Sequence, residues 1–149
     1  MNRIIVADWN RVMPEARAIR DLVFVQEQGV PLELEWDEFD AVCWHAIAYD
    51  SKQRVCGTGR LLPAQQGVSS IGRMAVLPEY RGQGIGASLL IALLERAQQR
   101  HDQAVVLHAQ THALGFYEKF GFIKEGEQYL EAGISHYSMR KRLAYRLGK

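Results

Sequence analysis

The hydrophobic and polar positions of this chain alternate in short runs that predict several β-strands. Polar or glycine-containing turns separate the runs, which occupy residues 3–9, 43–50, 54–63, 67–77, 104–109 and 136–143. The two runs on either side of the polar turn at residues 50–53 are close in sequence. They are therefore expected to pair as antiparallel neighbours in a β-meander.

Two segments instead repeat their apolar positions with the period of a helix. Residues 14–29 have Pro14 in the expected first turn and Gly29 as the expected terminator. The apolar face of this helix is predicted to hold Ala16, Ile19, Leu22 and Val23. In residues 84–100 an apolar residue recurs every four positions, which predicts a second helix with one buried face.

A third, short helix is expected at residues 113–122, and two strands then complete the order β-α-β-β-β-α-β-α-β-β. No repeat, low-complexity segment or linker interrupts this order. We therefore expect residues 1–149 to form a single domain, a mixed α/β layer structure with helices on the faces of its sheet. Residues 33–40 have five carboxylates in eight positions and fit neither periodicity, so a loop is predicted there.

The composition excludes several classes of protein. A chain of 149 residues that is 48% hydrophobic can bury a normal core without disulfides or a structural metal. Eighteen Lys and Arg residues balance 17 Asp and Glu residues, so the chain lacks the basic surface typical of nucleic-acid-binding proteins. It has neither an apolar run of about 18 residues nor an N-terminal secretion signal. A cytoplasmic location is expected, with neither nucleic acid nor membrane as a partner.

The two cysteines are not expected to form a disulfide. Pairing of the strands about residues 50–53 places Cys43 opposite Arg60 rather than opposite Cys56. Neither cysteine lies in a motif typical of a catalytic nucleophile.

A glycine-spaced turn, "RGQGIG", precedes the second long helix at residues 81–86. A helix N-terminus offers unpaired N–H groups to an anion, and glycines let the backbone approach a phosphate closely. The plain alternative is that the glycines only shape a tight connection. A P-loop is excluded, because Gly86 is followed by Ala87 and Ser88 instead of the lysine and hydroxyl residue that it requires.

The dinucleotide-binding fingerprint is a second alternative, since Gly82, Gly84 and Ala87 satisfy G-x-G-x-x-[GA]. Its context is wrong. The residues "PEYR" separate the glycines from the preceding strand, and the next strand, "AVVLHAQ", does not end in the acidic residue that holds a ribose. Asp102 lies before that strand instead of after it.

The segment "MAVLPEYRGQGIGASLL" resembles motif A of the GCN5-related N-acetyltransferase (GNAT) superfamily, whose pattern [QR]-x-x-G-x-[GA] is matched by Arg81, Gly84 and Gly86. The later segment "ALGFYEKFGF" resembles motif B of the same superfamily. Both motifs occur in the expected order, separated by one helix and one strand. The segments "VFVQEQGVP" and "DAVCWHAIA" are similar to those of its ElaA-like or YjcF-like subgroup.

This resemblance implies the acyl-CoA N-acyltransferase fold, with a central, mostly antiparallel twisted sheet, helices on both faces and a splay between the fourth and fifth strands. It implies a metal-free enzyme that transfers an acetyl group from acetyl-CoA to a primary amine of a small molecule or peptide by direct attack. A non-catalytic acyl-CoA binding or sensing module is the alternative. A homodimer is compatible with either. The cofactor-binding residues that it implies are Met74, Ala75, Val76, Arg81, Gly82, Gln83, Gly84, Gly86 and Ala87.

The resemblance also implies that Tyr117 protonates the leaving thiolate of CoA; the less favoured alternative is an aromatic residue of the core. The base that deprotonates the amine is not identified. The acceptor-side candidates are Glu27, Glu35, His45 and His112, and for each a structural role is at least as plausible.

Two charged segments complete the candidate site. The acidic residues of segment 33–40 would attract a cationic amine, and Trp36 and Phe39 within it suggest a recognition surface; a solvated loop is the alternative. The C-terminal basic residues are interpreted mainly as a solvated strand end and otherwise as contacts to the 3′-phosphate of CoA. These residues are Arg140, Lys141, Arg142, Arg146 and Lys149.

Overall fold

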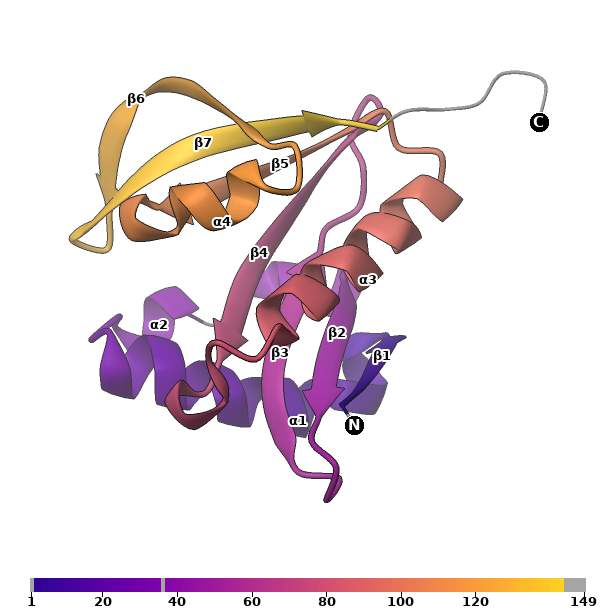
Figure 1. Cartoon of the computed structure of the whole chain (residues 1–149), viewed down its shortest axis with the longest axis vertical. Helices are drawn as coiled ribbons and strands as arrows, with labels where there is room; N and C mark the ends of the chain where they lie inside the picture. The colour runs from indigo at the N-terminus through magenta and orange to yellow at the C-terminus, as the bar shows by residue number, and fades with distance from the viewer. Residues whose placement is uncertain (1, 36, 144–149) are drawn as a thin grey trace.

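The computed structural model describes residues 2–35 and 37–143, which form one seven-stranded sheet with helices on both faces (Figure 1). The strands are β1 (Arg3–Ala7), β2 (Trp44–Tyr49), β3 (Val55–Leu61), β4 (Val68–Val76), β5 (Ala104–Gln110), β6 (Ile123–Glu131) and β7 (Ile134–Arg142). Their order across the sheet is β1-β2-β3-β4-β5-β7-β6. The mixed α/β fold and the predicted order of its main elements are therefore confirmed.

The sheet divides between β4 and β5, its one parallel pair among the described strands. These strands pair only at Val68–Ala104, Ser69–Val105 and Ser70–Val106, although β4 continues to Val76 and β5 to Gln110. Beyond Ser70 and Val106 the strands diverge, as Figure 1 shows. The expected splay between the fourth and fifth strands is thus present.

The first helix begins earlier than the sequence pattern predicts. Helix α1 (Trp9–Arg20) is capped by Asp8, whose carboxylate accepts a hydrogen bond from the Arg11 N–H at 3.1 Å, and Pro14 lies inside the helix. The prediction that residues 3–9 form a strand and that Pro14 opens the helix was therefore wrong at this boundary. The helix begins directly after Asp8 because its carboxylate accepts a hydrogen bond from a free N–H of the first turn. Proline has no side-chain acceptor and cannot cap a helix in this way.

The helix continues as a π-helix, η1 (Asp21–Glu27), and ends before Gly29, which has a φ of 74°. Of the predicted apolar face, Ala16, Ile19 and Val23 are buried, but Leu22 is 45% exposed. The wider π-helical turn changes the angular spacing of side chains, so a face assigned with a period of 3.6 residues does not extend into this segment.

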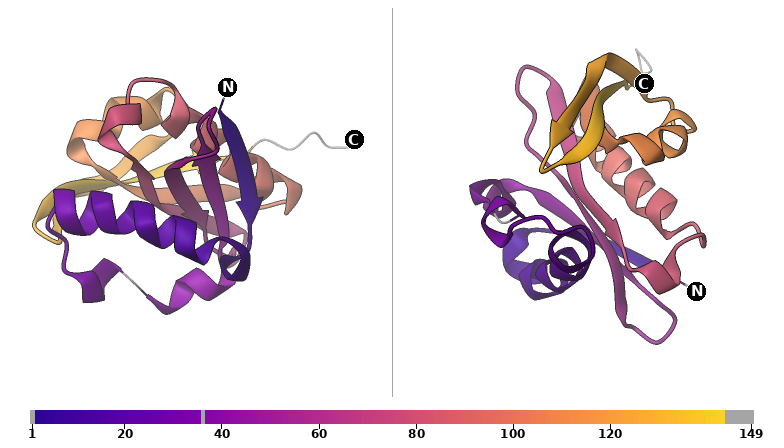
Figure 2. Two further views of the ribbon diagram at one scale, coloured as in Figure 1. Left: turned by 90° about the horizontal axis from the view of Figure 1, so that it is seen from below. Right: turned by 90° about the vertical axis from the view of Figure 1, so that its left-hand side faces the viewer.

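The long helix α3 (Ile85–Gln99) lies on the opposite face of the sheet from α1 (Figure 2). Helix α1 packs against β2, β3 and β4, and α3 packs against β1 to β4. As the periodicity predicts, α3 buries one face, made of Ile85, Leu89, Leu90, Leu93, Leu94 and Ala97. The short helix α4 (Leu114–Glu118) contacts β5, and Gly121 follows it with a φ of 90°.

The acidic segment is not a loop throughout. It contains the short helix α2 (Leu32–Glu35) and a 3₁₀-helix, η2 (Glu38–Val42), which Asp37 caps by accepting from the Phe39 N–H at 3.0 Å. Two further 3₁₀-turns are η3 (Pro78–Tyr80) and η4 (Thr111–Ala113). No helix in the described part of the chain is long and apolar enough to cross a membrane.

Both cysteines are buried free thiols, in agreement with the expected absence of a disulfide. The register used for that expectation was wrong by two residues, since Arg60 pairs with His45 and not with Cys43. The connection between β2 and β3 contains one more residue than predicted, and a register shift between Ala48 and Tyr49 adds another. A shift of two keeps every side chain on its predicted face.

Candidate functional site

The glycine turn between β4 and α3 depends on a left-handed backbone. Gly82 has a φ of 79° and Gly84, the N-cap of α3, has a φ of 83°. Side chains strongly disfavour this region of conformational space, whereas glycine does not. No atom lies within 4 Å of the position that a Cβ would take on either residue. These two glycines are therefore required for their conformation, and the turn leaves open space beside them.

The N-terminus of α3 presents N–H groups that the helix itself does not use. The Ser88 N–H is bonded to the Gly84 carbonyl at 3.1 Å, so the N–H groups of Ile85, Gly86 and Ala87 precede the first bond of the helix. A Cβ on Gly86 would stand 3.6 Å from Phe116 Cζ of α4 and 3.9 Å from Val76. The turn, the end of β4 and α4 are consequently packed close together, and the free N–H groups at the start of α3 are suited to an anion.

Arg81 supports this turn instead of offering its own groups to a ligand. Its N–H is bonded to the Pro78 carbonyl at 3.2 Å, and its Nε donates to the Val76 carbonyl at 2.9 Å. Its terminal nitrogens donate to both carboxylate oxygens of Glu27, at 2.7 and 2.8 Å. The expectation that the Arg81 N–H faces a phosphate is therefore corrected.

Glu27 is held by the same contact, which ties the end of η1 to the glycine turn. Its hydrogen bonds with Arg81 lower the pKa of the Glu27 carboxyl. A carboxylate that is paired with a guanidinium and made less basic is a poor acceptor of a proton from an amine. The structure thus places Glu27 in a structural contact, which argues against the hypothesis that it is the base; that hypothesis stays a prediction.

The part of β4 that faces the splay contains a β-bulge. Thr58 of β3 pairs with Ala75 and Arg60 pairs with Gly72, so Arg73 and Met74 lie opposite the single residue Gly59. Arg73 has a φ of 50°, and the Met74 side chain packs where a Cβ on Gly59 would stand. A bulge re-aims the strand locally, and here it does so where β4 has left β5.

Tyr117 lies on α4 among aromatic side chains. Its ring packs edge-on against Phe116, with centroids 5.0 Å apart, and against Phe122 at 6.0 Å. The surrounding protein buries the phenol and raises the pKa of Tyr117 to about 12. The hydroxyl therefore holds its proton at neutral pH. Because Phe116 also contacts Gly86, the helix that carries Tyr117 and the glycine turn are brought together as the two motifs imply.

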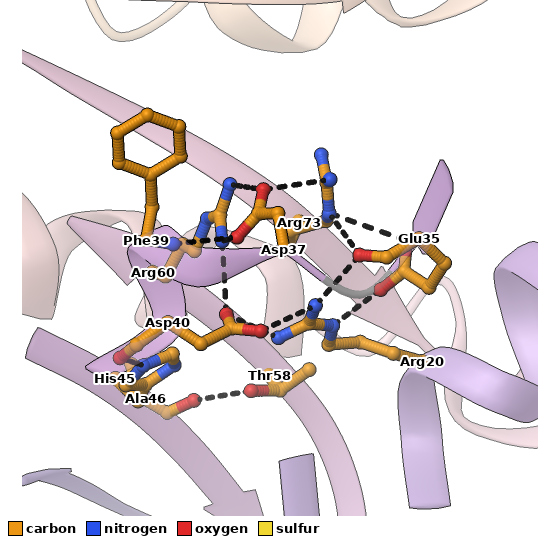
Figure 3. A network of polar contacts seen from close by, with 10 residues as sticks. All are labelled: Arg20, Glu35, Asp37, Phe39, Asp40, His45, Ala46, Thr58, Arg60 and Arg73. Atoms are coloured by element: carbon orange, nitrogen blue, oxygen red, sulfur yellow. Dashed lines mark hydrogen bonds and ion pairs between the residues drawn. The ribbon is translucent and has the colours of Figure 1, made fainter. Parts of the chain in front are cut away.

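A buried network of arginines and carboxylates lies beside the bulge (Figure 3). Arg20 of α1 donates to Asp40 at 2.8 Å and 3.1 Å, and it also pairs with the carboxylate of Glu35. All three side chains are almost completely buried. Burial raises the pKa of Glu35 in spite of the neighbouring arginines. Glu35 is consequently an internal partner of Arg20, which argues against a role as an acceptor-side base; that role stays a prediction.

The outer part of the network joins β3 and β4 to the acidic segment. Arg60 donates to Asp37 at 2.7 and 2.8 Å and to Asp40 at 2.9 Å, and Arg73 donates to Asp37 at 3.2 Å. Burial alone would raise the pKa of Asp37, but Arg60 and Arg73 outweigh it and lower this pKa to about 2. Asp37 therefore remains ionised over the working range of most enzymes.

The prediction of an exposed negative field over residues 33–40 is therefore wrong for its central carboxylates, because arginines neutralise them. Sequence reasoning missed all three arginines, Arg20, Arg60 and Arg73. The sequence did contain a signal for two of them, because Arg20 lies among the apolar positions of a helix and Arg60 lies in a strand. A charged residue at a buried position predicts a buried ionic partner. Phe39 is 46% exposed, as expected for a recognition surface, while Trp36 lies outside the described residues.

The two histidine candidates lie in different environments. His45 is buried, with its Nε2 2.9 Å from the Asp40 carbonyl and its ring against Trp9, and burial lowers its pKa. It is a packed internal residue, as the structural interpretation expected, and an acceptor-side role stays a prediction. His112 lies in η4, directly after β5, and its side chain is exposed. Its role stays a prediction.

The basic C-terminal residues divide similarly. Arg140 of β7 pairs with Glu125 of β6 at 2.6 Å, which agrees with a solvated strand end. Lys141 and Arg142 close β7, and a contact with CoA stays a prediction for them. Arg146 and Lys149 lie outside the described residues.

Comparison with known proteins gives consistent matches over most of the chain. A family model described as an acetyltransferase (GNAT) domain matches residues 36–143. The uncharacterised N-acetyltransferase YjcF of Bacillus subtilis (strain 168) is 34% identical over 140 residues, which cover 93% of this chain and 99% of that protein. Protein ElaA of Escherichia coli (strain K12) is 32% identical over 127 residues, covering 83% of this chain and 82% of ElaA.

Solved structures agree with these relatives. An acyl-CoA N-acyltransferase from Pseudomonas aeruginosa is 30% identical and superposes with a TM-score of 0.85, covering 95% of this chain and 99% of that chain. The crystal structure of Escherichia coli ElaA superposes with the same TM-score at 27% identity, with the same shares covered. The expected similarity to the ElaA-like or YjcF-like subgroup is thereby confirmed.

Proposed function

Because this chain belongs to the acetyltransferase (GNAT) domain family, we propose that it transfers an acetyl group from acetyl-CoA to a primary amine of a small molecule or peptide. The observation that carries this proposal is the splay between β4 and β5, bordered by the N-terminus of α3. The splay leaves strand edges that a ligand can pair with, and the helix N-terminus supplies groups for an anion. Acetyl-CoA has both an amide-containing arm and a pyrophosphate.

The turn binds the pyrophosphate in this proposal. The N–H groups of Gly82, Gln83 and Gly84 would act together with the first N–H groups of α3, which include those of Gly86 and Ala87. Arg81 contributes indirectly, by bonding Glu27 and the Val76 carbonyl so that the turn keeps its shape. No metal is required, because helix N–H groups and the helix dipole neutralise part of the phosphate charge.

The arm of the cosubstrate then lies along the free edge of β4. Met74, Ala75 and Val76 occupy the part of this strand that follows the bulge, where β5 has diverged. Their side chains are occupied by packing: Ala75 contacts the side of α1 and η1, and Met74 and Val76 belong to the core on the side of α3. Their contribution to the ligand is therefore through the main chain, which can also stabilise the oxyanion.

Tyr117 is the proposed acid. In direct attack, the amine nitrogen bonds to the carbonyl carbon of the thioester, the carbon–sulfur bond breaks, and the sulfur leaves as a thiolate. A thiol has a reference pKa of about 8.5, so a phenol with a pKa of about 12 donates to the thiolate only while that thiolate is poorly solvated. The aromatic surroundings of Tyr117 provide such a poorly solvated position.

Two measurements test this function. Calorimetric titration with acetyl-CoA measures binding, and a thiol-release assay over a panel of primary amines measures transfer. Binding together with amine-dependent release is the expected result. Binding with no release on any amine would support an acyl-CoA sensing module, and no binding at all would contradict both functions.

A further inference from the structure

Of the four acceptor-side candidates named from the sequence, three are buried or paired with an arginine, and His112 is exposed. Glu27 is paired with Arg81, and Glu35 and His45 are buried. Primary amines have a reference pKa of about 10.4, so most of the acceptor arrives as an ammonium ion that must lose a proton. A side chain that accepts this proton has to lie near the splay and be open to solvent.

A pocket of about 400 Å³ lies over β5, β6 and β7, and β5 is one of the two strands that border the splay. Its volume is in the range of small-molecule sites. The pocket is lined by Val106, His108, Glu125, Gly126, Ser138, Met139 and Arg140. Val106 is the last residue of β5 that pairs with β4, and His108 is two residues further, about 7 Å along the strand.

The alternation of side chains along β5 places His108 on the face of the sheet away from α3. Leu107 and Ala109 belong to the core that includes α3, so His108, between them, points to the other face. On β4, Ile71 is in the same core, and Gly72 therefore also faces away from α3. Nothing lies within 4 Å of the position that a Cβ on Gly72 would take. Open space thus borders the start of the splay on the face that His108 shares.

The imidazole of His108 is held through one nitrogen. Its Nδ1 is 2.5 Å from Tyr129 Oη and 3.4 Å from Ser138 Oγ, and its ring meets that of Tyr129 edge-on. Among the residues that the structure describes, no group is bonded to Nε2 of His108. The pocket is shaped by the irregular pairing of β6, whose register with β7 shifts between Glu125 and Tyr129.

We propose that this pocket receives the acceptor amine, and that Nε2 of His108 removes a proton from it, with Tyr129 and Ser138 positioning the ring. The proposal rests on the proposed function, whose acceptor side it specifies. Nδ1 then carries the hydrogen and donates to Tyr129, which leaves Nε2 as the accepting nitrogen. The volume of the pocket suits a small amine or a single amine-bearing side chain.

Acetyl transfer to an ammonium ion releases one proton overall. An ammonium ion gives one proton to Nε2 of His108, and the neutral amine bonds to the acetyl carbon while the carbon–sulfur bond breaks. Tyr117 gives its proton to the leaving sulfur. The amide nitrogen releases its second proton to solvent, from which Tyr117 is re-protonated, and His108 returns its proton to solvent. The products are an N-acetylated amine, CoA thiol and one net proton.

The charged and titratable groups around His108 belong to β4, β6 and β7. Glu125 of β6 and Arg140 of β7 neutralise one another in the wall of the pocket. Beyond Tyr129, His136 stacks on that ring and approaches Glu131 at 3.7 Å. From β4, Arg73 projects beside Gly72 but is paired with Glu35 and Asp37. The charges in the wall of the pocket are therefore paired with one another, whereas Nε2 of His108 has no bonded partner among the described residues.

The test compares His108→Gln with His112→Gln, since both histidines are exposed and only the first lines the pocket. Thiol release is followed against pH with n-butylamine, 2-phenylethylamine, spermidine and a lysine-containing tripeptide. His108→Gln is expected to lower kcat/KM by about 10² to 10³ and to remove the limb of the pH profile that rises with pH. Its acetyl-CoA affinity and melting temperature should equal those of the wild type. His112→Gln should stay within about twofold.

Two further readouts separate a base from a structural residue. Tyr129→Phe should lower kcat by a smaller factor than His108→Gln while keeping the rising limb. Val106→Phe adds bulk to the lining of the pocket and should raise the KM for amines without changing the affinity for acetyl-CoA. The proposal is overturned if the wild type is active and His108→Gln has a kcat/KM within twofold of the wild-type value and keeps the rising limb of the pH profile.

If the wild type releases no thiol, the proposed function fails, and nitrogen NMR of His108 decides the site by itself. Titration of n-butylamine into the CoA-bound protein should shift the Nε2 resonance of His108 and leave that of His112 unchanged. The absence of any shift at His108 overturns the pocket as an amine site.

Discussion

Phe116 lies directly over Gly86, with its Cζ 3.6 Å from the place where a Cβ on that glycine would stand. The two residues belong to the two motifs that suggested the family, and in the fold they pack side by side. Val76, at the end of β4, lies 3.9 Å from the same Cβ position. The turn that is proposed to bind phosphate and the helix that carries Tyr117 are therefore held in a fixed relation.

Gly86→Ala should weaken acetyl-CoA binding by about tenfold without loss of stability. The added methyl group would make ordinary contacts with Phe116 and Val76, and Gly86 lies in a helix, where alanine is more favourable than glycine by roughly 0.5–1 kcal/mol. The same methyl group narrows the space proposed for the arm of acetyl-CoA. Calorimetric titration and thermal melting measure the two effects.

Gly115→Ala is the matched control, since no atom lies within 4 Å of its Cβ position. It should leave acetyl-CoA affinity unchanged. Equal affinities of Gly86→Ala and the wild type would show that the ligand does not pass between α3 and α4.

Tyr117→Phe should lower kcat by about 10² and leave the dissociation constant of acetyl-CoA within about twofold. The ring contacts with Phe116 and Phe122 are kept, and only the hydroxyl that protonates the leaving thiolate is lost. Thiol release at saturating acetyl-CoA measures the effect. Tyr49→Phe, on β2, controls for the loss of a tyrosine hydroxyl elsewhere. Unchanged turnover with every amine would leave Tyr117 as a core aromatic only.

The order of the main elements was predictable because each helix and strand shows its period locally. The splay followed from the family resemblance, and the structure confirms it through the early end of β4–β5 pairing at Ser70 and Val106. The start of the first helix was not predicted correctly, because Pro14 gave a stronger local signal than the Asp8 cap. The change from α-helix to π-helix at η1 exposes Leu22. This change could not be predicted from an apolar pattern with a period of 3.6 residues.

The candidate site was predictable only on its cofactor side. The glycines of the turn lie at alternate positions within one short segment and carry a local motif, whereas the acceptor side is assembled from distant segments. Arg20 and Asp40 are 20 positions apart, and His108 and Tyr129 are 21 apart. Pairings of this kind depend on the register of the sheet and on a π-helical turn. The sequence therefore suggested isolated acidic residues where the fold contains neutralised pairs.

Asp37→Asn should destabilise the protein by about 2 kcal/mol at pH 7 and by progressively less in acid. Arg60 and Arg73 lower the pKa of Asp37 from 3.8 to about 2. The ionised form is therefore favoured in the folded state, and this stabilisation is present above about pH 4 and disappears as the pH falls toward 2. Asparagine can still cap η2, so the comparison isolates the charge.

Urea unfolding of both proteins at pH 7, 5, 4 and 3 measures this difference. The curves should converge in acid. A difference in unfolding free energy that stays constant over this range would mean that Asp37 is not stabilised as a carboxylate.

Glu27→Gln should lower stability by less than about 1 kcal/mol and leave kcat within about twofold. The pair with Arg81 is more than one-third exposed on both sides, and exposed ion pairs contribute little. A weaker contact between η1 and the turn is expected to reduce acetyl-CoA affinity slightly. Steady-state kinetics decide the point: a fall in kcat of about 10² with unchanged affinity would restore Glu27 as the base.

Transfer of an acetyl group from acetyl-CoA to an amine can be measured by mass spectrometry with isotopically labelled acetyl-CoA, which detects the transferred group on the acceptor. The protein is incubated with the amine panel, and Tyr117→Phe is run in parallel. We expect at least one primary amine to gain the labelled acetyl group in proportion to the CoA thiol released, at a rate that Tyr117→Phe reduces. Tight binding of acetyl-CoA without labelled amine at any pH between about 6 and 9 would contradict the account and identify the chain as a binding module.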